Sequence, residues 1–213
     1  MRGAVQVSSY DEWWEAVHGL LMRHQLTRAQ ISAVVRGARV SLRPGTEDLL
    51  RLLHKLGVPL LIVSAGITDV IQETLSSHGL LLDNISICSN TMIFGDDDKL
   101  VDFKETPPVH SRNKSSTNER ESVYFAKHAH RQCVVVVGDR PGDAHVTCGL
   151  VPDEKCIKVG FYNCQPEGQD AHEDKLNDYR ENFDVVACGE NQRMCLVSDI
   201  IQDIIGKANP RTK

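Results

Sequence analysis

The stretch Val134–Asp143, which reads Val-Val-Val-Val-Gly-Asp-Arg-Pro-Gly-Asp, constrains the fold more than any other part of the sequence. Four consecutive β-branched residues predict a short strand buried on both faces, as in a parallel sheet. Gly138 allows a sharp turn after this strand, and the carboxylates of Asp139 and Asp143 follow. Ligands of open α/β sheets bind beyond the carboxyl ends of the strands, so the two carboxylates are candidates for holding a hard cation such as Mg²⁺. The alternative is a plain strand–turn–helix corner, in which the aspartates cap a short helix over Ala144–Cys148.

Strands alternate with helices along most of the chain, which predicts an α/β fold with a parallel sheet covered by helices on both faces. Two capping boxes, Ser9–Glu12 and Thr27–Gln30, first open two helices with no strand between them. The elements predicted after them are a helix Thr46–Leu56, a strand Val58–Val63, a helix up to His78, a strand Ile85–Cys88, a hairpin of Met92–Phe94 and Leu100–Phe103, a helix over about Glu119–His130, a strand Cys156–Gly160, a helix over Ala171–Glu181, a strand Phe183–Ala187 and a last helix capped by Asn191. We expect a small helical part over residues 1–42, a core over 43–207 and a tail over 208–213.

Composition excludes several classes of protein. The 213 residues are enough for one α/β domain, and 24 basic against 29 acidic residues give a net charge of −5, without a basic stripe for nucleic acid or a membrane surface. No apolar run is long enough to span a membrane, and the start lacks the pattern of a signal peptide. Seven cysteines without a C-x-x-C pair favour reduced, mostly buried thiols. A soluble, cytosolic monomer is expected, with neither nucleic acid nor membrane as a partner.

Two further residues are candidates for binding an anion. Ser64 follows the predicted strand Val58–Val63, and its hydroxyl together with free N–H groups of Ala65 and Gly66 at a helix start could hold a phosphate. The alternative is that Ser64 only caps the helix. Lys114 lies in a long polar loop, a kind of loop that is usually functional or disordered, although most loop lysines are simply solvated. The pairing of Ser64 with Asp139 at the ends of two strands strengthens the case for all of these residues.

A strand followed by Ser, a later Lys, and a strand followed by Gly-Asp-x-x-x-Asp resemble the second, third and fourth motifs of the haloacid dehalogenase superfamily. Within it, the chain is similar to the cytosolic 5′-nucleotidase III family from about Asp11 to Ile205. The stretches that carry the closer resemblance are Glu12-Trp13-Trp14, His18–Leu21, Val63–Val70, Cys88-Ser89-Asn90, Phe103-Lys104, Asn113-Lys114 and Ile157–Phe161. The resemblance implies a Rossmann-like core with a partial helical cap formed by residues 1–42.

The resemblance also implies a chemistry. In the family an aspartate attacks the phosphorus of a nucleoside 5′-monophosphate, and water then hydrolyses the phosphoaspartate, while Mg²⁺ and cationic groups neutralise the transferring phosphoryl group. By this resemblance Asp139 would bind Mg²⁺ and Asp143 would support the shell of the metal. Ser64 and the amide of Ala65 would hold phosphate oxygens, and Lys114 would neutralise charge on the nucleophile and the phosphate.

The first motif of the family, an apolar strand followed by Asp-x-Asp-x-Thr, is not found in this sequence. The single Asp-x-Asp, Asp96-Asp97-Asp98, lies in the predicted hairpin turn and no Thr follows it. We therefore expect an amino-terminally shortened form that lacks the nucleophile, the general acid/base and the central strand between those ending at Ser64 and Asp139. Such a chain would be inactive by itself; the alternatives are a remnant that only binds nucleotide or phosphate, and a fragment of low stability.

Trp13 and Trp14 are candidates for stacking on the base of the nucleotide. Adjacent residues of a helix point about 100° apart, so one tryptophan at most would meet the ligand while the other packs; core packing of both is the alternative. By resemblance, Trp-Trp at this place is typical of the branch that acts on 7-methylguanosine monophosphate, whose cationic base favours tryptophan. The sequence therefore favours 7-methyl-GMP modestly over UMP and CMP.

Overall fold

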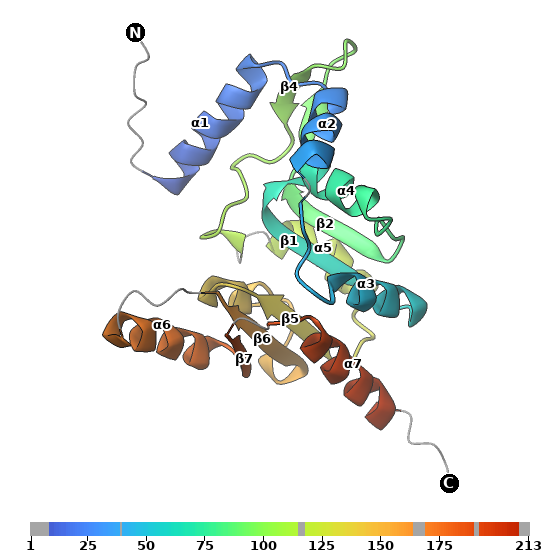
Figure 1. Cartoon of the computed structure of the whole chain (residues 1–213), viewed down its shortest axis with the longest axis vertical. Helices are drawn as coiled ribbons and strands as arrows, with labels where there is room; N and C mark the ends of the chain where they lie inside the picture. Colours follow the sequence, from blue (N-terminus) through green and yellow to red (C-terminus); the bar gives the residue numbers. More distant parts are fainter. Residues whose placement is uncertain (1–8, 39, 115–117, 164–168, 190–191, 209–213) are drawn as a thin grey trace. The chain divides into compact units, whose positions relative to one another are not determined.

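The computed structural model describes residues 9–38, 40–114, 118–163, 169–189 and 192–208. The chain divides into two compact units, one of Met1–Ser41 with Val58–Thr117 and one of Leu42–Gly57 with Asn118–Lys213. Both units combine helices with parallel strands (Figure 1), which confirms the predicted α/β class. The assignment of residues 1–42 to a cap stays a prediction, and most of the predicted tail 208–213 lies outside the described residues.

The first unit contains a parallel strand pair, β1 with β2, and an antiparallel hairpin, β3 with β4. Helix α4 packs on β1 and β2, α2 packs against α4, and α1 packs on β4. The apolar core of this unit joins buried side chains of α2 to those of the hairpin, among them Ile31, Leu100 and Phe103. Its elements are α1 Tyr10–Arg23, α2 Arg28–Ala38, β1 Leu60–Ile67, α4 Thr68–Ser77, β2 Ile85–Asn90, β3 Met92–Phe94 and β4 Leu100–Phe103.

Both amino-terminal helices begin where the capping boxes predict. The N–H of Glu12 donates to the hydroxyl of Ser9 at 3.1 Å, directly before α1. Before α2, the N–H of Gln30 donates to the hydroxyl of Thr27 at 3.2 Å, and the N–H of Thr27 donates to the Gln30 side chain at 3.0 Å. Reciprocal bonds of this kind satisfy N–H groups that the first turn of a helix leaves without a partner.

The second unit contains a three-stranded parallel sheet in the order β5-β6-β7. Helix α6 packs on β6 and β7, and α3 packs against α7. Buried aromatic side chains dominate the core between α6 and the sheet, including Tyr162, Tyr179 and Phe183. The elements are α3 Thr46–Lys55, α5 Asn118–Lys127, β5 Val134–Gly138, the 3₁₀ turns η2 Pro141–His145 and η3 Asp153–Lys155, β6 Cys156–Tyr162, α6 Gln169–Asn182, β7 Val185–Cys188 and α7 Cys195–Ala208.

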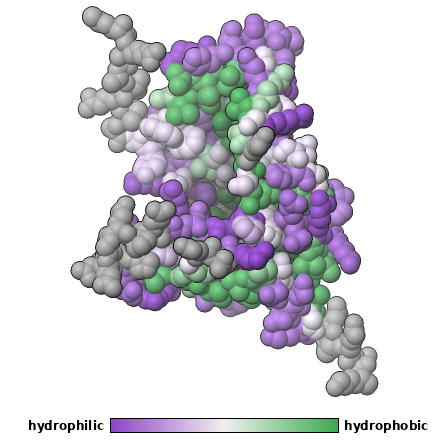
Figure 2. Space-filling model, viewed as in Figure 1, coloured by the Kyte–Doolittle hydropathy of each residue, from purple (hydrophilic) through white to green (hydrophobic). Residues whose placement is uncertain are grey.

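Strand β5 differs from its prediction in burial. Val136 is buried, whereas Val137 is 38% exposed and the rest of the strand is half-buried. In the described part of the chain, β5 has a strand partner on one side, β6, and β1 likewise has one partner, β2. A strand at the edge of a sheet leaves its outer backbone N–H and C=O groups without a strand partner. Figure 2 shows apolar surface on this face of the second unit. The expectation that another strand belongs between those ending at Ser64 and Asp139 stays a prediction.

Two local predictions are wrong. No α-helix covers Ala144–Cys148; a single 3₁₀ turn, η2, lies earlier at Pro141–His145, because Pro141 fixes the first position of the turn. The cysteines are also less buried than expected: among the six that the structure describes, none is buried, all are free, and Cys148, Cys188 and Cys195 are exposed. The predicted cap Asn191 lies outside the described residues. Among the helices of the described ranges, none is long and apolar enough to cross a membrane.

Candidate functional site

The carboxyl end of β1 forms a bulge at Ser64–Gly66. Val63 pairs with Cys88 and Ile67 pairs with Asn90, so four steps along β1 correspond to two steps along β2. The extra residues leave the ladder there, as bulges near functional sites commonly do. The strand runs on to Ile67, which is also the N-cap of α4, so Ser64 does not cap the helix. The prediction of free N–H groups at a helix start is therefore wrong in detail. Ala65 and Gly66 precede the helix, and the N–H of Gly66 donates to the Ser64 hydroxyl at 3.0 Å.

The side chain of Asn90 joins this bulge to the loop after β4. Asn90 is fully buried at the end of β2. Its amide nitrogen donates to the carbonyls of Ala65 at 3.0 Å, Gly66 at 3.1 Å and Val109 at 2.9 Å. Its carbonyl oxygen accepts the N–H of Val109 at 2.8 Å. One side-chain amide thus holds together two chain segments that are far apart in the sequence. The stretch Cys88-Ser89-Asn90 contributed to the family resemblance, but this role of Asn90 was not predicted from the sequence.

Lys114 ends the described part of that loop, five residues after Val109. The backbone before it is folded tightly: Asn113 accepts the N–H of His110 at 2.7 Å and donates to the carbonyl of Pro108 at 2.8 Å. Val109 and His110 are buried, while Lys114 itself is half-buried. Ser64, Ala65 and Lys114 therefore belong to one unit, and the Asn90 side chain connects the segments that carry them.

In the second unit, the turn after β5 is built around Asp143. Its Oδ2 accepts the N–H groups of Asp139 at 3.1 Å and Arg140 at 3.2 Å, and the residue is 8% exposed. A Cβ at Gly138 would lie 2.3 Å from the Cβ of Asp143, so only glycine fits before this turn. The buried carboxylate thus holds its own turn in shape and leaves Asp139 exposed at the end of the strand.

Three residues that the sequence did not single out surround Asp139. Asn163, one residue past the end of β6, donates to Asp139 Oδ2 at 3.2 Å, and the hydroxyl of Tyr179 on α6 donates to the carbonyl of Asp139. Arg43 in turn donates to Asn163 Oδ1 at 2.8 Å, with its guanidinium 4.5 Å above the ring of Phe161. A signal for Asn163 was present, because it follows β6 as Asp139 follows β5.

The residues present fit a magnesium ion. No group of three or more His, Cys, Asp or Glu side chains gathers in the described part of the chain. Mg²⁺, however, is usually held by one or two carboxylates, with water and substrate phosphate completing its shell. Asp139 offers an exposed carboxylate, and Asp143 lies buried directly behind it, which matches a binding residue with a supporting one.

Helix α1 places the two tryptophans in different surroundings. Trp13 is 47% exposed, while Trp14 is half-buried and meets the ring of His18 edge to face, with the centroids 6.0 Å apart. The two indoles lie perpendicular to each other at 4.9 Å. His18 stacks on Phe103 at 3.7 Å, and burial lowers the pKa of His18. The expectation that one tryptophan at most meets a base while the other packs stays a prediction.

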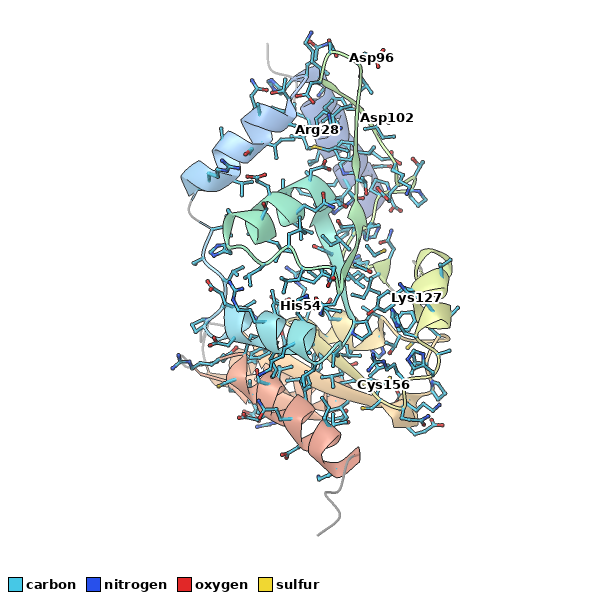
Figure 3. All side chains as sticks on the ribbon, turned by 90° about the vertical axis from the view of Figure 1, so that its right-hand side faces the viewer. Arg28, His54, Asp96, Asp102, Lys127 and Cys156 are labelled. Atoms are coloured by element: carbon cyan, nitrogen blue, oxygen red, sulfur yellow. The ribbon has the colours of Figure 1, made fainter. Side chains whose placement is uncertain are left out.

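The single Asp-x-Asp lies in the β3–β4 turn, as predicted (Figure 3 labels Asp96). Asp97 accepts Lys99 Nζ at 2.9 Å, and Asp98 accepts the Arg28 guanidinium at 2.6 Å. These exposed ion pairs are typical of a solvated hairpin turn. The position of Asp96–Asp98 away from any parallel strand end agrees with the exclusion of this motif as a nucleophile.

Comparisons with known proteins bear on the family of this chain. The family model of the pyrimidine 5′-nucleotidases (UMPH-1) matches residues 5–205. The 7-methylguanosine phosphate-specific 5′-nucleotidase of Gallus gallus is 31% identical over 194 residues, 91% of this chain and 64% of the relative, and that of Homo sapiens is 31% identical over 91% of this chain and 62% of the relative. The chain thus spans less than two thirds of these relatives.

Solved structures show the same fold. A crystal structure of cytosolic 5′-nucleotidase IIIB bound to cytidine has a TM-score of 0.76 and 25% identity, over 95% of this chain and 66% of that one. A probable phosphoserine phosphatase from Vibrio cholerae, 17% identical, has a TM-score of 0.54 over 95% of this chain and 59% of that one, and shows the fold alone. The described elements therefore have the haloacid dehalogenase-like fold. Because the family model matches residues 5–205, nearly the whole of this chain, the chain belongs to the pyrimidine 5′-nucleotidase family.

Proposed function

We propose that this chain carries the phosphate-binding and metal-binding parts of a cytoplasmic, monomeric 5′-nucleotidase that hydrolyses nucleoside 5′-monophosphates. The observation that carries the proposal is the bulge at Ser64–Gly66, tied through Asn90 to the loop of Lys114. A hydroxyl, backbone N–H groups outside the strand ladder and a lysine are the groups that bind a phosphate dianion. The family match and the relatives named for phosphate-specific nucleotidases support the same substrate class.

Each residue has a distinct part in the proposed reaction. Ser64 and the N–H of Ala65 bind oxygens of the phosphate; the hydroxyl of Ser64 turns from the N–H of Gly66 toward the ligand, which frees that N–H as a further donor. Lys114 neutralises charge on the transferring phosphoryl group. Asp139 would hold Mg²⁺, with Asp143 shaping the turn behind it; a metal held there would supply positive charge for phosphoryl transfer. The attacking aspartate would come from an Asp-x-Asp-x-Thr strand, which this sequence does not contain.

The second candidate function is binding of nucleotide or phosphate without turnover. The position of Asp97 and Asp98 in ion pairs of the hairpin turn favours it, because the residues that the structure describes then hold no aspartate pair at a strand end besides Asp139 and Asp143. Phosphate release by this chain and by a chain extended with an Asp-x-Asp-x-Thr strand, measured side by side with UMP, CMP and 7-methyl-GMP, decides between the two. Release by neither chain, with correct folding of both, would contradict the nucleotidase proposal.

In such an extended chain, Asp139→Asn is expected to lower turnover and raise the Mg²⁺ concentration needed for half-maximal activity. Loss of even an outer partner of a metal site costs about 10–100-fold, so at least this much is expected for a residue that holds the metal. Lys114→Ala should lower turnover with less effect on the Mg²⁺ requirement. Steady-state phosphate release against Mg²⁺ concentration separates the two; unchanged kinetics for Lys114→Ala would transfer the role to Lys104.

In the same extended chain, Trp14→Ala is expected to weaken the binding of 7-methyl-GMP more than the binding of UMP. The methylated guanine carries a positive charge, and a cation over an indole face gains about 0.5–2 kcal/mol. The ratio of kcat/KM for the two substrates measures this difference, with Trp13→Ala as the matched variant. Equal losses on both substrates would mean that Trp14 only packs against His18.

A further inference from the structure

The loop between β4 and Lys114 is bound on two sides within the first unit. On one side Val109 makes two hydrogen bonds with Asn90, which also holds the carbonyls of Ala65 and Gly66. On the other side the next residue, His110, reaches the first turn of helix α1. Two adjacent buried residues, 1% and 5% exposed, thus connect the phosphate-binding bulge to the helix that carries the tryptophans.

The tautomer of His110 follows from its neighbours. Its Nδ1 accepts the N–H of Arg112 at 3.2 Å, so Nδ1 carries no proton. Nε2 therefore bears the hydrogen and donates it to Asp11 Oδ1 at 2.7 Å. The imidazole is 6% exposed, and the carboxylate of Asp11 is 55% exposed. A hydrogen bond to a carboxylate from a buried donor is one of the stronger kinds, and it has one defined geometry here.

A second contact supports the same connection. The guanidinium of Arg112 lies 4.1 Å above the ring of Tyr10, the first residue of α1, and the Tyr10 ring lies 5.9 Å from that of His110. Two nearby residues of the loop, His110 and Arg112, therefore face two consecutive residues of the helix. Trp13 and Trp14 follow Asp11 within one turn, so a displacement of the first turn of α1 moves the indoles as well.

We propose that His110 and Asp11 are positioning residues, which tie α1 to the loop of Lys114 so that the phosphate end and the base end of the nucleotide site move together. The inference rests on the proposed function, in which Ser64 and Lys114 bind phosphate and α1 meets the base. A ligand that binds two rigidly connected parts loses less free energy in ordering them. The connection therefore favours the binding of whole nucleotides. Binding of phosphate alone should then change the surroundings of the two tryptophans.

The first test follows phosphate binding in the full chain. Inorganic phosphate is titrated and its binding is measured directly by ³¹P NMR, while fluorescence reports on Trp13 and Trp14, the only tryptophans of the sequence. The indole emission is expected to change with the same saturation curve as the ³¹P signal. Asp11→Ala should abolish the fluorescence change and leave phosphate binding within about twofold, the size of a small change in preorganisation. Phosphate binding without any response of the indoles in the parent chain overturns the inference.

Two variants separate the hydrogen bond from charge. Asp11→Asn keeps an oxygen that can accept from His110 Nε2 and should retain the fluorescence response, although it loses the same negative charge as Asp11→Ala. Glu15→Ala removes one negative charge from an exposed position of the same helix and should behave like the parent chain. A loss of the response in all three variants would show that the charge of α1 matters and the positioning contact does not.

The second test does not depend on phosphate. Hydrogen exchange reports on the N–H groups of Val109, His110, Arg112 and Asn113, which are all bonded within the loop or to Asn90. Asp11→Ala should accelerate their exchange about tenfold, the size expected for losing a hydrogen bond to a charged group, with Asp11→Asn and Glu15→Ala close to the parent. Unchanged exchange in Asp11→Ala overturns the inference. Faster exchange in Asp11→Ala, together with no ³¹P evidence of phosphate binding, would contradict only the proposed phosphate site.

Discussion

The chain of 213 residues is expected to release phosphate from UMP, CMP and 7-methyl-GMP about 10⁶-fold more slowly than a chain that also carries an Asp-x-Asp-x-Thr strand. Removal of a covalent nucleophile costs on this order in other enzymes that form a covalent intermediate. The residues proposed to bind phosphate and Mg²⁺ are all in this sequence, so binding and turnover should separate. The measurement is phosphate release at saturating Mg²⁺, with phosphate binding by ³¹P NMR on the same sample.

The control is the extended chain in which the first aspartate of the added motif is replaced by asparagine, which should be as slow as the chain alone. Mg²⁺-dependent turnover by the 213 residues, abolished by Asp139→Asn, would contradict the prediction. It would mean that a residue of this chain attacks the phosphorus. The candidate pair Asp96 and Asp98 could then be tested by substitution, although Asp98 is bonded to Arg28 in the hairpin turn.

Local sequence signals predicted much of the fold correctly. The hairpin Met92–Phe94 with Leu100–Phe103 has the predicted bounds, since Gly95 and three aspartates permit only a turn between two apolar runs. The capping boxes of α1 and α2 were equally clear, because both partners lie within four residues. The strands proved harder: β1 runs past Ser64 to Ile67, since the bulge is held by Asn90, a residue more than twenty positions later.

The candidate site shows the same division between local and distant signals. Asp139 and Asp143 could be found from the sequence because glycine, proline and two aspartates surround one turn. The partner of Asp139, Asn163, directly follows the neighbouring strand β6, and its role depends on the register of β5 with β6. His110 is a single histidine in a polar loop, and nothing near it in the sequence indicates that its partner is Asp11, 99 positions earlier.

Asn90→Ala is expected to cost the first unit about 3–5 kcal/mol of stability, because a buried donor or acceptor left without its partner costs about 1–3 kcal/mol. The substitution removes the acceptor of the buried Val109 N–H and a donor to the carbonyls of Ala65, Gly66 and Val109. This is a large part of the total of about 5–15 kcal/mol that stabilises an ordinary domain. Urea unfolding followed by fluorescence measures it, since Trp13 and Trp14 both lie on α1 of the same unit.

Asn84→Ala is the matched control, because Asn84 makes one such bond, to the carbonyl of Val58 at 2.8 Å. It should cost about 0.5–1.5 kcal/mol, the net value of a single hydrogen bond. Equal losses for the two variants would mean that the Asn90 contacts hold the bulge and the loop no more firmly than one part-buried hydrogen bond.

Asn90→Asp distinguishes the loss of hydrogen bonds from the loss of volume. The substituted side chain has nearly the same shape and still offers an oxygen to the N–H of Val109, but its other oxygen would face the carbonyls of Ala65 and Gly66. Burial and these oxygens disfavour the ionised form and raise its pKa in the folded state, so the folded chain binds the proton more tightly than the unfolded chain. The variant should therefore lose stability as the pH rises from 5 to 7, relative to the parent. A pH-independent difference between the two proteins would show that the acid is solvated and that Asn90 is not the buried link between the phosphate-binding bulge and the loop of Lys114.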